Sequence, residues 1–414
     1  MEETLVPLAQ QPLIQDPLGV TAVLAIICGF WFMLEQRSGW RVFNYLPPLL
    51  WIYATPLVLS NLGIIGGALG VGGQDVLPSS NSSYDWLRQY GLPIFIVLML
   101  IKVDVAGAVR VMGRGVGVML LGTAGIMVGG VVSYVIVSGN LDPDAWKGFG
   151  ALAGSWIGGT GNMAAAAQML ETPPDQFGLA ILADNVIYVI WLPILLGSKA
   201  FADRFNRWAR VPEDRLAQMD AAAAAQDTEE AAPGMRDLLY LGAITAILLW
   251  TAQSLAPLLP EVRIGGENLI SSGTWKILCL TTFALILSTT PVRRLPGATA
   301  IATALIYVFV AGMGARAELS GLDQAPWFIV GAFIWIFIHG AFVLFGAWLL
   351  KVDVHSAAIA SAANVGGAAS APVVAAYHRQ SLIPASILMA LIGYAIGNYL
   401  AFLTGQLARL ASGG

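Results

Sequence analysis

The segment GSWIGGTGNMAAAAQML, residues 154–170, carries four glycines within eight residues of a chain that is otherwise strongly apolar. Glycine is a poor helix former, and backbone groups freed from a helix are costly in lipid. A second segment, AANVGGAASAPVVA at 362–375, has the same character, and a shift of 208 positions aligns Gly158–Gly159 with Gly366–Gly367. We expect both segments to be broken or re-entrant at membrane depth, surrounded by protein or by a water-filled cavity. Close helix packing through small residues is the alternative.

The composition around these segments is that of a membrane protein. Of 414 residues, 57% are hydrophobic and only 11% charged, and the mean hydropathy is +0.73. A net charge of −4 without a basic stripe gives no sign of a nucleic-acid partner. The two cysteines each lie in an apolar run, so neither a disulfide framework nor a metal site is expected. We therefore expect the lipid bilayer as the main partner and no cofactor, apart from a coupling ion.

Ten apolar stretches reach the roughly 20 residues that a spanning helix needs. They are 17–35, 43–65, 91–109, 116–138, 177–197, 237–259, 273–290, 295–313, 327–350 and 382–406. The two small-residue segments, 147–170 and 355–377, raise the count to twelve if they cross the membrane.

The positive charges favour ten crossings. The densest cluster of Lys and Arg lies at 198–236, and it faces the cytoplasm only if 147–170 returns to the side from which it enters. With both segments re-entrant, fifteen of the 21 Lys and Arg residues lie at the cytoplasmic side and both termini lie outside. The predicted location is the cell (inner) membrane.

Five crossings per half give the two halves opposite orientations. We therefore predict an all-α polytopic protein of the inverted-repeat transporter type, with a first half at 1–197, a cytoplasmic linker at 198–236 and an inverted second half at 237–414. In such proteins discontinuous segments bind the solute and the coupling ion near the membrane midplane.

Asp184 is the clearest ionisable group at mid-span, seven residues into 177–197 and followed by Asn185. Such a carboxylate needs a proton, a cation or a polar partner. With Asn185 and Asn162 it could bind Na⁺, which takes oxygen ligands, or it could carry a proton. A structural hydrogen bond between helices is the alternative. The predicted solute site comprises Gly158, Gly159, Thr160, Gly161, Asn162, Asn364, Gly366, Gly367 and Ser370.

Other parts of the chain narrow the function. No H-E-x-x-H, P-loop or G-x-S-x-G motif is present, so no enzyme is expected. No Lys or Arg is found at mid-span, so an anionic solute would bind N–H groups at half-helix N-termini.

The block SWIGGTGNMAAAAQ…ILADNVIYVIW, together with ASAANVGGAASAPVVAA…ILMALIGYAIGNYLAFLTG, resembles the YjcL-like family of integral membrane proteins over nearly the whole chain. That family shows a Gly-Gly-x-x-Asn turn followed by an Asp-Asn pair on the next helix. The second family motif, Ala-Asn-Val-Gly-Gly, matches 363–367, and this chain continues with Ala-Ala-Ser where other members often have Pro and Thr.

More remotely, the organisation is similar to glutamate:sodium symporters and 2-hydroxycarboxylate transporters, and beyond them to bile-acid:sodium symporters and cation/proton antiporters. This resemblance implies a core and a scaffold domain, an elevator-like motion and a homodimer. We predict a secondary active transporter for a small polar solute, with a carboxylate-bearing one (amino acid, short peptide or organic acid) as the favoured class, coupled to Na⁺ or H⁺. A cation/proton antiporter without an organic substrate is the alternative.

Overall fold

The computed structural model describes residues 11–44, 48–69, 73–212, 215, 232–264, 267–317 and 324–413. The central part of the predicted linker, 213–214 and 216–231, lies outside the described residues. The described chain is almost entirely helical, with one short antiparallel pair of strands.

The elements of the first half are α1 (Pro17–Ser38), α2 (Pro48–Leu59), α3 (Leu62–Leu69), α4 (Ser82–Trp86), α5 (Leu92–Leu100), α6 (Val105–Met112), α7 (Arg114–Val137), α8 (Ala145–Gly158), α9 (Thr160–Met169), α10 (Pro174–Gly197) and α11 (Ala202–Trp208). Those of the second half are α13 (Met235–Leu255), β1 (Val262–Ile264), β2 (Glu267–Ile270), α14 (Ser272–Ser288), α15 (Ala298–Arg316), α16 (Ala325–Leu350), α17 (Val354–Val365), α18 (Gly367–His378) and α19 (Ile383–Ala411).

The protein is a polytopic helical membrane protein. Within the described ranges, seven helices are long and apolar enough to cross a membrane, or eight if the bent pair 82–100 and 105–112 is one span. Two shorter apolar helices, Pro48–Leu59 and Ser272–Ser288, fall on the predicted spans 43–65 and 273–290. Each of the ten predicted spans thus coincides with an apolar helix or helix pair.

Two predicted spans are not the single continuous helices that hydropathy suggests. The span 91–109 bends by 49° between α5 and α6, where Asp104 accepts a hydrogen bond from the backbone N–H of Gly107 and so begins a new helix. The span 43–65 is interrupted between α2 and α3 at Ser60–Asn61, and the Asn61 amide donates to the carbonyl of Ala317. Hydropathy is insensitive to such capping and tertiary contacts, which explains both differences.

Polar groups that the charge pattern assigns to one side of the membrane contact one another. Arg293 pairs with Asp104 at 2.9 Å, and Lys199 donates to the carbonyl of Tyr377. On the opposite side, Lys276 donates to the carbonyl of Gln89 at 2.9 Å. These pairs join segments that are far apart in sequence and hold the ends of different helices together.

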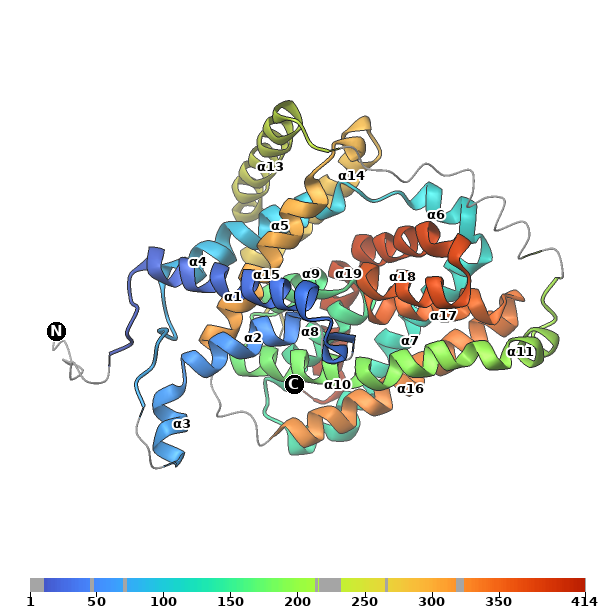
Figure 1. Ribbon diagram of the computed structural model, residues 1–414, viewed down its shortest axis with the longest axis horizontal. Coiled ribbons are helices and arrows are strands. Elements are labelled where there is room, and N and C mark those ends of the chain that lie inside the picture. The colour runs from blue at the N-terminus through green and yellow to red at the C-terminus, as the bar shows by residue number, and fades with distance from the viewer. Residues whose placement is uncertain are drawn as a thin grey trace.

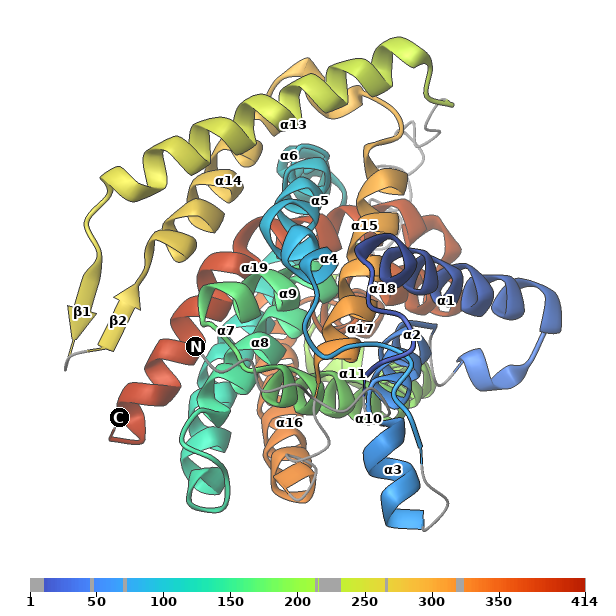
Figure 2. The same cartoon turned by 90° about the vertical axis from the view of Figure 1, so that its left-hand side faces the viewer.

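The helices fall into two groups (Figures 1 and 2). The hairpin group consists of α7, α8, α9, α10, α16, α17, α18 and α19, and α7 packs along α16 at its centre. The flanking group consists of α1, α2, α5, α13, α14 and α15, in which α15 packs against both α2 and α5. Figure 2 shows α13 and α14 side by side, with β1 and β2 extending from their ends.

Asp353 connects the linker to the start of α17. The carboxylate is fully buried, accepts hydrogen bonds from the backbone N–H and the hydroxyl of Ser356, and pairs with Arg215 at 3.1 Å. We expect Asp353→Ala to lower the free energy of unfolding by roughly 3 kcal/mol, because it removes a helix cap and leaves the guanidinium unpaired. Thermal denaturation in detergent measures the change.

Asp16 offers a matched control for this substitution. Its exposed carboxylate caps α1 by accepting from the N–H of Gly19 at 2.7 Å. Loss of such an exposed cap costs about 1 kcal/mol. Equal shifts in the melting temperature for Asp16→Ala and Asp353→Ala would show that the buried ion pair contributes nothing.

Candidate functional site

Helices α8 and α9 fold back on each other as a helical hairpin. At its open end the hydroxyl of Thr172 donates to the carbonyl of Lys147 at 3.3 Å. Closer to the tip, a Cβ atom on Gly154 would lie 2.5 Å from the carbonyl oxygen of Asn162, so the two backbones touch. The turn is made by Gly159, whose φ of 79° and ψ of −176° belong to a region that is essentially restricted to glycine. The chain therefore turns around within this segment.

Helices α17 and α18 form a second hairpin. The Nδ1 atoms of His355 and His378, near its two ends, are 3.0 Å apart. Its turn lies at Gly366 and Gly367, and the φ of Gly367 is +58°, a left-handed value that favours glycine.

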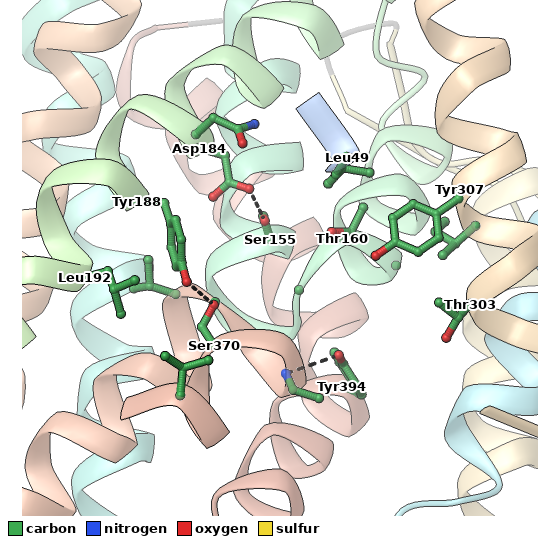
Figure 3. A pocket seen from close by; sticks show the side chains of 18 of the residues that line it. Leu49, Ser155, Thr160, Asp184, Tyr188, Leu192, Thr303, Tyr307, Ser370 and Tyr394 are labelled. Carbon is green, nitrogen blue, oxygen red and sulfur yellow. Dashed lines mark hydrogen bonds between the residues drawn. The ribbon is translucent and has the colours of Figure 1, made fainter. Parts of the chain in front are cut away.

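The tips of the two hairpins meet. A Cβ atom on Gly367 would lie only 3.6 Å from the Cα of Gly159, and one on Gly159 would lie 3.0 Å from the ring of Tyr394. The hydroxyl of Tyr394, on α19, accepts a hydrogen bond of 3.4 Å from the backbone N–H of Ala368 (Figure 3). Small residues at the turns thus permit two irregular segments to approach each other beside one aromatic side chain.

Asp184 on α10 lies next to these tips. Its carboxylate accepts hydrogen bonds from the hydroxyl of Ser155 at 2.8 Å and from the indole N–H of Trp156 at 2.9 Å, both on α8. An ionised carboxylate has about four acceptor sites. Two donors therefore leave capacity for a cation or for a bound proton, and the carboxylate faces a cavity (Figure 3).

This cavity has a volume of about 1070 Å³ and lies between the hairpin group and the flanking group. The hairpin tips, α10 and α19 form one wall, and α1, α2, α5 and α15 form the other. Figure 3 shows Thr303 and Tyr307 of α15 on the side of the cavity opposite Asp184, Tyr188 and Ser370. A space of this size accommodates a small organic molecule rather than a single ion.

Seven of the residues predicted from the sequence line the cavity: Gly159, Thr160, Gly161, Asp184, Asn185, Gly366 and Ser370. Gly158, Asn162, Asn364 and Gly367 are not among its lining residues. The amide of Asn162 donates to Asn398 at 2.8 Å and to the carbonyl of Tyr394 at 3.0 Å. That of Asn364 donates to the carbonyl of Met119 at 3.0 Å. The structure thus places these two amides behind the tips, where they attach the hairpins to α19 and α7.

Several residues that line the cavity were not predicted from the sequence. Tyr188 follows Asp184 by one helical turn, and its hydroxyl accepts a hydrogen bond of 2.9 Å from Ser370 on the second hairpin. The i, i+4 spacing from Asp184 could have identified it. Glu35 and Tyr307 also line the cavity, but nothing in the sequence brings α1 or α15 to the hairpin tips.

The first turn of α9 also contributes to the cavity wall. Its first N–H groups, at Thr160 and Gly161, have no partner within the helix, and both residues line the cavity. A helix N-terminus carries about half a positive charge and favours anionic groups.

Comparison with known proteins identifies the family of this chain. The family described as "Protein of unknown function (DUF819)" matches residues 22–410, and the chain belongs to this family. The chain is also 25% identical over 387 residues to the uncharacterized membrane protein YjcL of Bacillus subtilis (strain 168), covering 90% of this chain and 92% of YjcL. The resemblance noted from the sequence motifs is thereby confirmed.

Proposed function

We propose that this member of the DUF819 family is a secondary active transporter that moves a small polar organic solute by alternating access. The observation that carries the proposal is the cavity at the paired hairpin tips, whose two walls belong to different groups of helices. Displacement of the hairpin group against the flanking group would carry the cavity contents across the membrane, as in an elevator. Binding at discontinuous helices near the midplane is typical of secondary transporters.

The order and packing of the helices support an inverted repeat. The series α1, α2, α5, α7, hairpin and α10 has its counterpart in α13, α14, α15, α16, hairpin and α19. Helix α1 packs on α2 and α15, and its counterpart α13 packs on α14 and α5. On this proposal the halves are 1–197 and 237–414, the connection between them is cytoplasmic, and both termini lie outside the cell membrane. The homodimer implied by the remote resemblance stays a prediction.

Asp184 is proposed as the coupling site. Its carboxylate would alternate between a proton or Na⁺ and an unoccupied state, with the amide oxygen of neighbouring Asn185 as a further ligand. The volume of the cavity favours a solute transporter over the alternative, an antiporter for bare cations.

The N–H groups at the start of α9 support a solute that bears a carboxylate. Thr160 and Gly161 would supply these N–H groups at one end of the cavity. Amino acids, short peptides and organic acids share this chemistry.

Labelling of a tip residue from both sides of the membrane tests alternating access. Thr160→Cys would be prepared with Cys28→Ser and Cys279→Ser, so that it is the single thiol in the chain. In vesicles of both orientations, a membrane-impermeant thiol reagent should modify Thr160→Cys from either side. Asp85→Cys, at an exposed position on α4, should react from one side alone. Modification of Thr160→Cys from a single side, at every Na⁺ concentration and pH tested, would refute the proposal.

A further inference from the structure

We infer that the solute must carry a protonated amine, which narrows the proposed class to amino acids and peptides and excludes organic acids. The inference rests on the proposed transport function and on the charges, aromatic rings and size of the cavity between the two helix groups. Each of these three properties contributes a separate step.

The charged side chains that line the cavity are acidic. Asp184 lies on the wall formed by the hairpin group, and Glu35 lies on α1 in the opposite wall. Neither Lys nor Arg is found among the described residues that line the space. Between walls of low dielectric constant, charges interact more strongly than they do in bulk solvent, so the acidic side chains attract cations and repel anions.

The N–H groups at the start of α9 do not outweigh the negative charge of the cavity. A helix N-terminus is equivalent to about half of one positive charge, whereas the Glu35 carboxylate alone carries a full negative charge, even when Asp184 holds its coupling cation. With the coupling cation on Asp184, the charge of Glu35 is still unbalanced, so a carboxylate at the helix terminus requires a positive charge on the same solute. A zwitterionic amino acid meets this condition, and a mono- or dicarboxylic acid does not.

Aromatic rings provide a second set of contacts for an ammonium group. The rings of Tyr188, Tyr307, Tyr377 and Tyr394 line the cavity together with Phe43 and Phe95. Tyrosine and phenylalanine faces attract ammonium ions within about 6 Å of the ring centre. The Tyr377 ring already holds the ammonium nitrogen of Lys199, 4.9 Å from its centre, so the other rings are the ones open to a solute.

Much of the remaining lining is apolar, so the solute also needs an apolar part. Met99 and Ile306 of the flanking group and Val189, Leu192 and Val373 of the hairpin group line the cavity. Binding sites for small molecules generally combine such a lining with a few orienting polar groups. An amino acid with a large apolar side chain therefore matches the charge, the rings and the volume together.

Three related ligands test the amine requirement. Phenylalanine has an amine, a carboxylate and an aromatic side chain, 3-phenylpropionate is the same molecule without the amine, and phenethylamine is the same molecule without the carboxylate. Each would be added to the purified protein in detergent at pH 7, and the melting temperature recorded. Ligands that bind only the folded state raise it by several degrees at concentrations of about 100 Kd.

We expect phenylalanine to raise the melting temperature and 3-phenylpropionate to leave it unchanged. Stabilisation by 3-phenylpropionate equal to that by phenylalanine would overturn the inference. So would the absence of any stabilisation by phenylalanine and by phenethylamine. Stabilisation by phenethylamine alone would support the amine requirement but contradict the carboxylate subsite of the proposed function. Two-sided labelling of Thr160→Cys with no amine binding would leave the transporter proposal standing and remove this inference only.

Glu35→Gln gives an independent arm. This variant keeps the shape of the side chain and removes one negative charge from the cavity, so we expect the Kd for phenylalanine to rise about tenfold. Asp85→Asn removes a carboxylate from the exposed face of α4 and should leave that Kd unchanged. If the melting temperatures of both unliganded variants equal that of the wild type, an unchanged Kd in Glu35→Gln also counts against the inference.

Discussion

Asp184→Asn should lower solute transport at least ~100-fold and abolish its dependence on Na⁺ and pH. The substitution keeps the size of the side chain but removes the charge that would bind the coupling cation. Loss of charge-assisted interactions worth about 3 kcal/mol corresponds to that factor in affinity. The measurement is solute uptake by proteoliposomes, with and without a Na⁺ gradient, at two pH values.

The hydrogen-bond partners of Asp184 make this substitution informative. Ser155 and Trp156 donate to the carboxylate, and one amide oxygen can still accept from one of them. We therefore expect the fold to persist in Asp184→Asn while coupling is lost. Asp85→Asn, at an exposed position, serves as the control and should transport as the wild type does. Uptake by Asp184→Asn with unchanged Na⁺ and pH dependence would place the coupling site elsewhere.

Among the substitutions proposed here, Gly393→Ala should lower the free energy of unfolding most. Gly393 lies on α19 where that helix crosses the end of α8, and an added Cβ atom would collide with the carbonyl oxygen of Ile157. Because the opposing atom belongs to the backbone, the two helices must separate to accommodate the methyl group. Overpacking of this kind costs about 3 kcal/mol or more. Thermal denaturation in detergent should show a lower melting temperature, and a Thr160→Cys thiol introduced into the same variant should react faster with thiol reagents.

Gly242→Ala is the matched control. Gly242 lies within α13, and a Cβ atom there would meet nothing within 4 Å. Replacing an unobstructed helical glycine by alanine stabilises a helix by about 0.5–1 kcal/mol. The two substitutions should therefore shift the melting temperature in opposite directions. A melting temperature of Gly393→Ala equal to or above that of the wild type would contradict the close contact between α8 and α19.

The sequence predicted the helical membrane architecture well, for a physical reason. Burial in lipid requires about 20 apolar residues per crossing, and this constraint acts on contiguous residues, so it can be read locally. The positions of the turns could also be predicted from local sequence, since Gly158–Gly159 and Gly366–Gly367 interrupt otherwise apolar segments. The bends at Asp104 and Asn61 were missed, because they depend on a cap and on a contact with Ala317.

For the candidate site, too, some residues could be predicted from the sequence and others could not. Asp184 and the glycine turns stand out in the sequence because charged groups and irregular backbone are costly at membrane depth. The roles of Asn162 and Asn364 could not be inferred, since an amide at that depth can face either a cavity or a neighbouring helix. Only the structure places both of them against helix backbones.

The sequence by itself determined which segments are long and apolar enough to cross a membrane, where the chain turns around and which carboxylate lies at the turns. These features follow from the free-energy cost of exposing polar groups to lipid. That cost acts on each contiguous segment independently of how the helices pack. The tertiary structure alone decided that Glu35, Tyr307 and Asp184 line the same cavity. That arrangement depends on how helices distant in sequence pack together, and many packings satisfy the same local hydropathy.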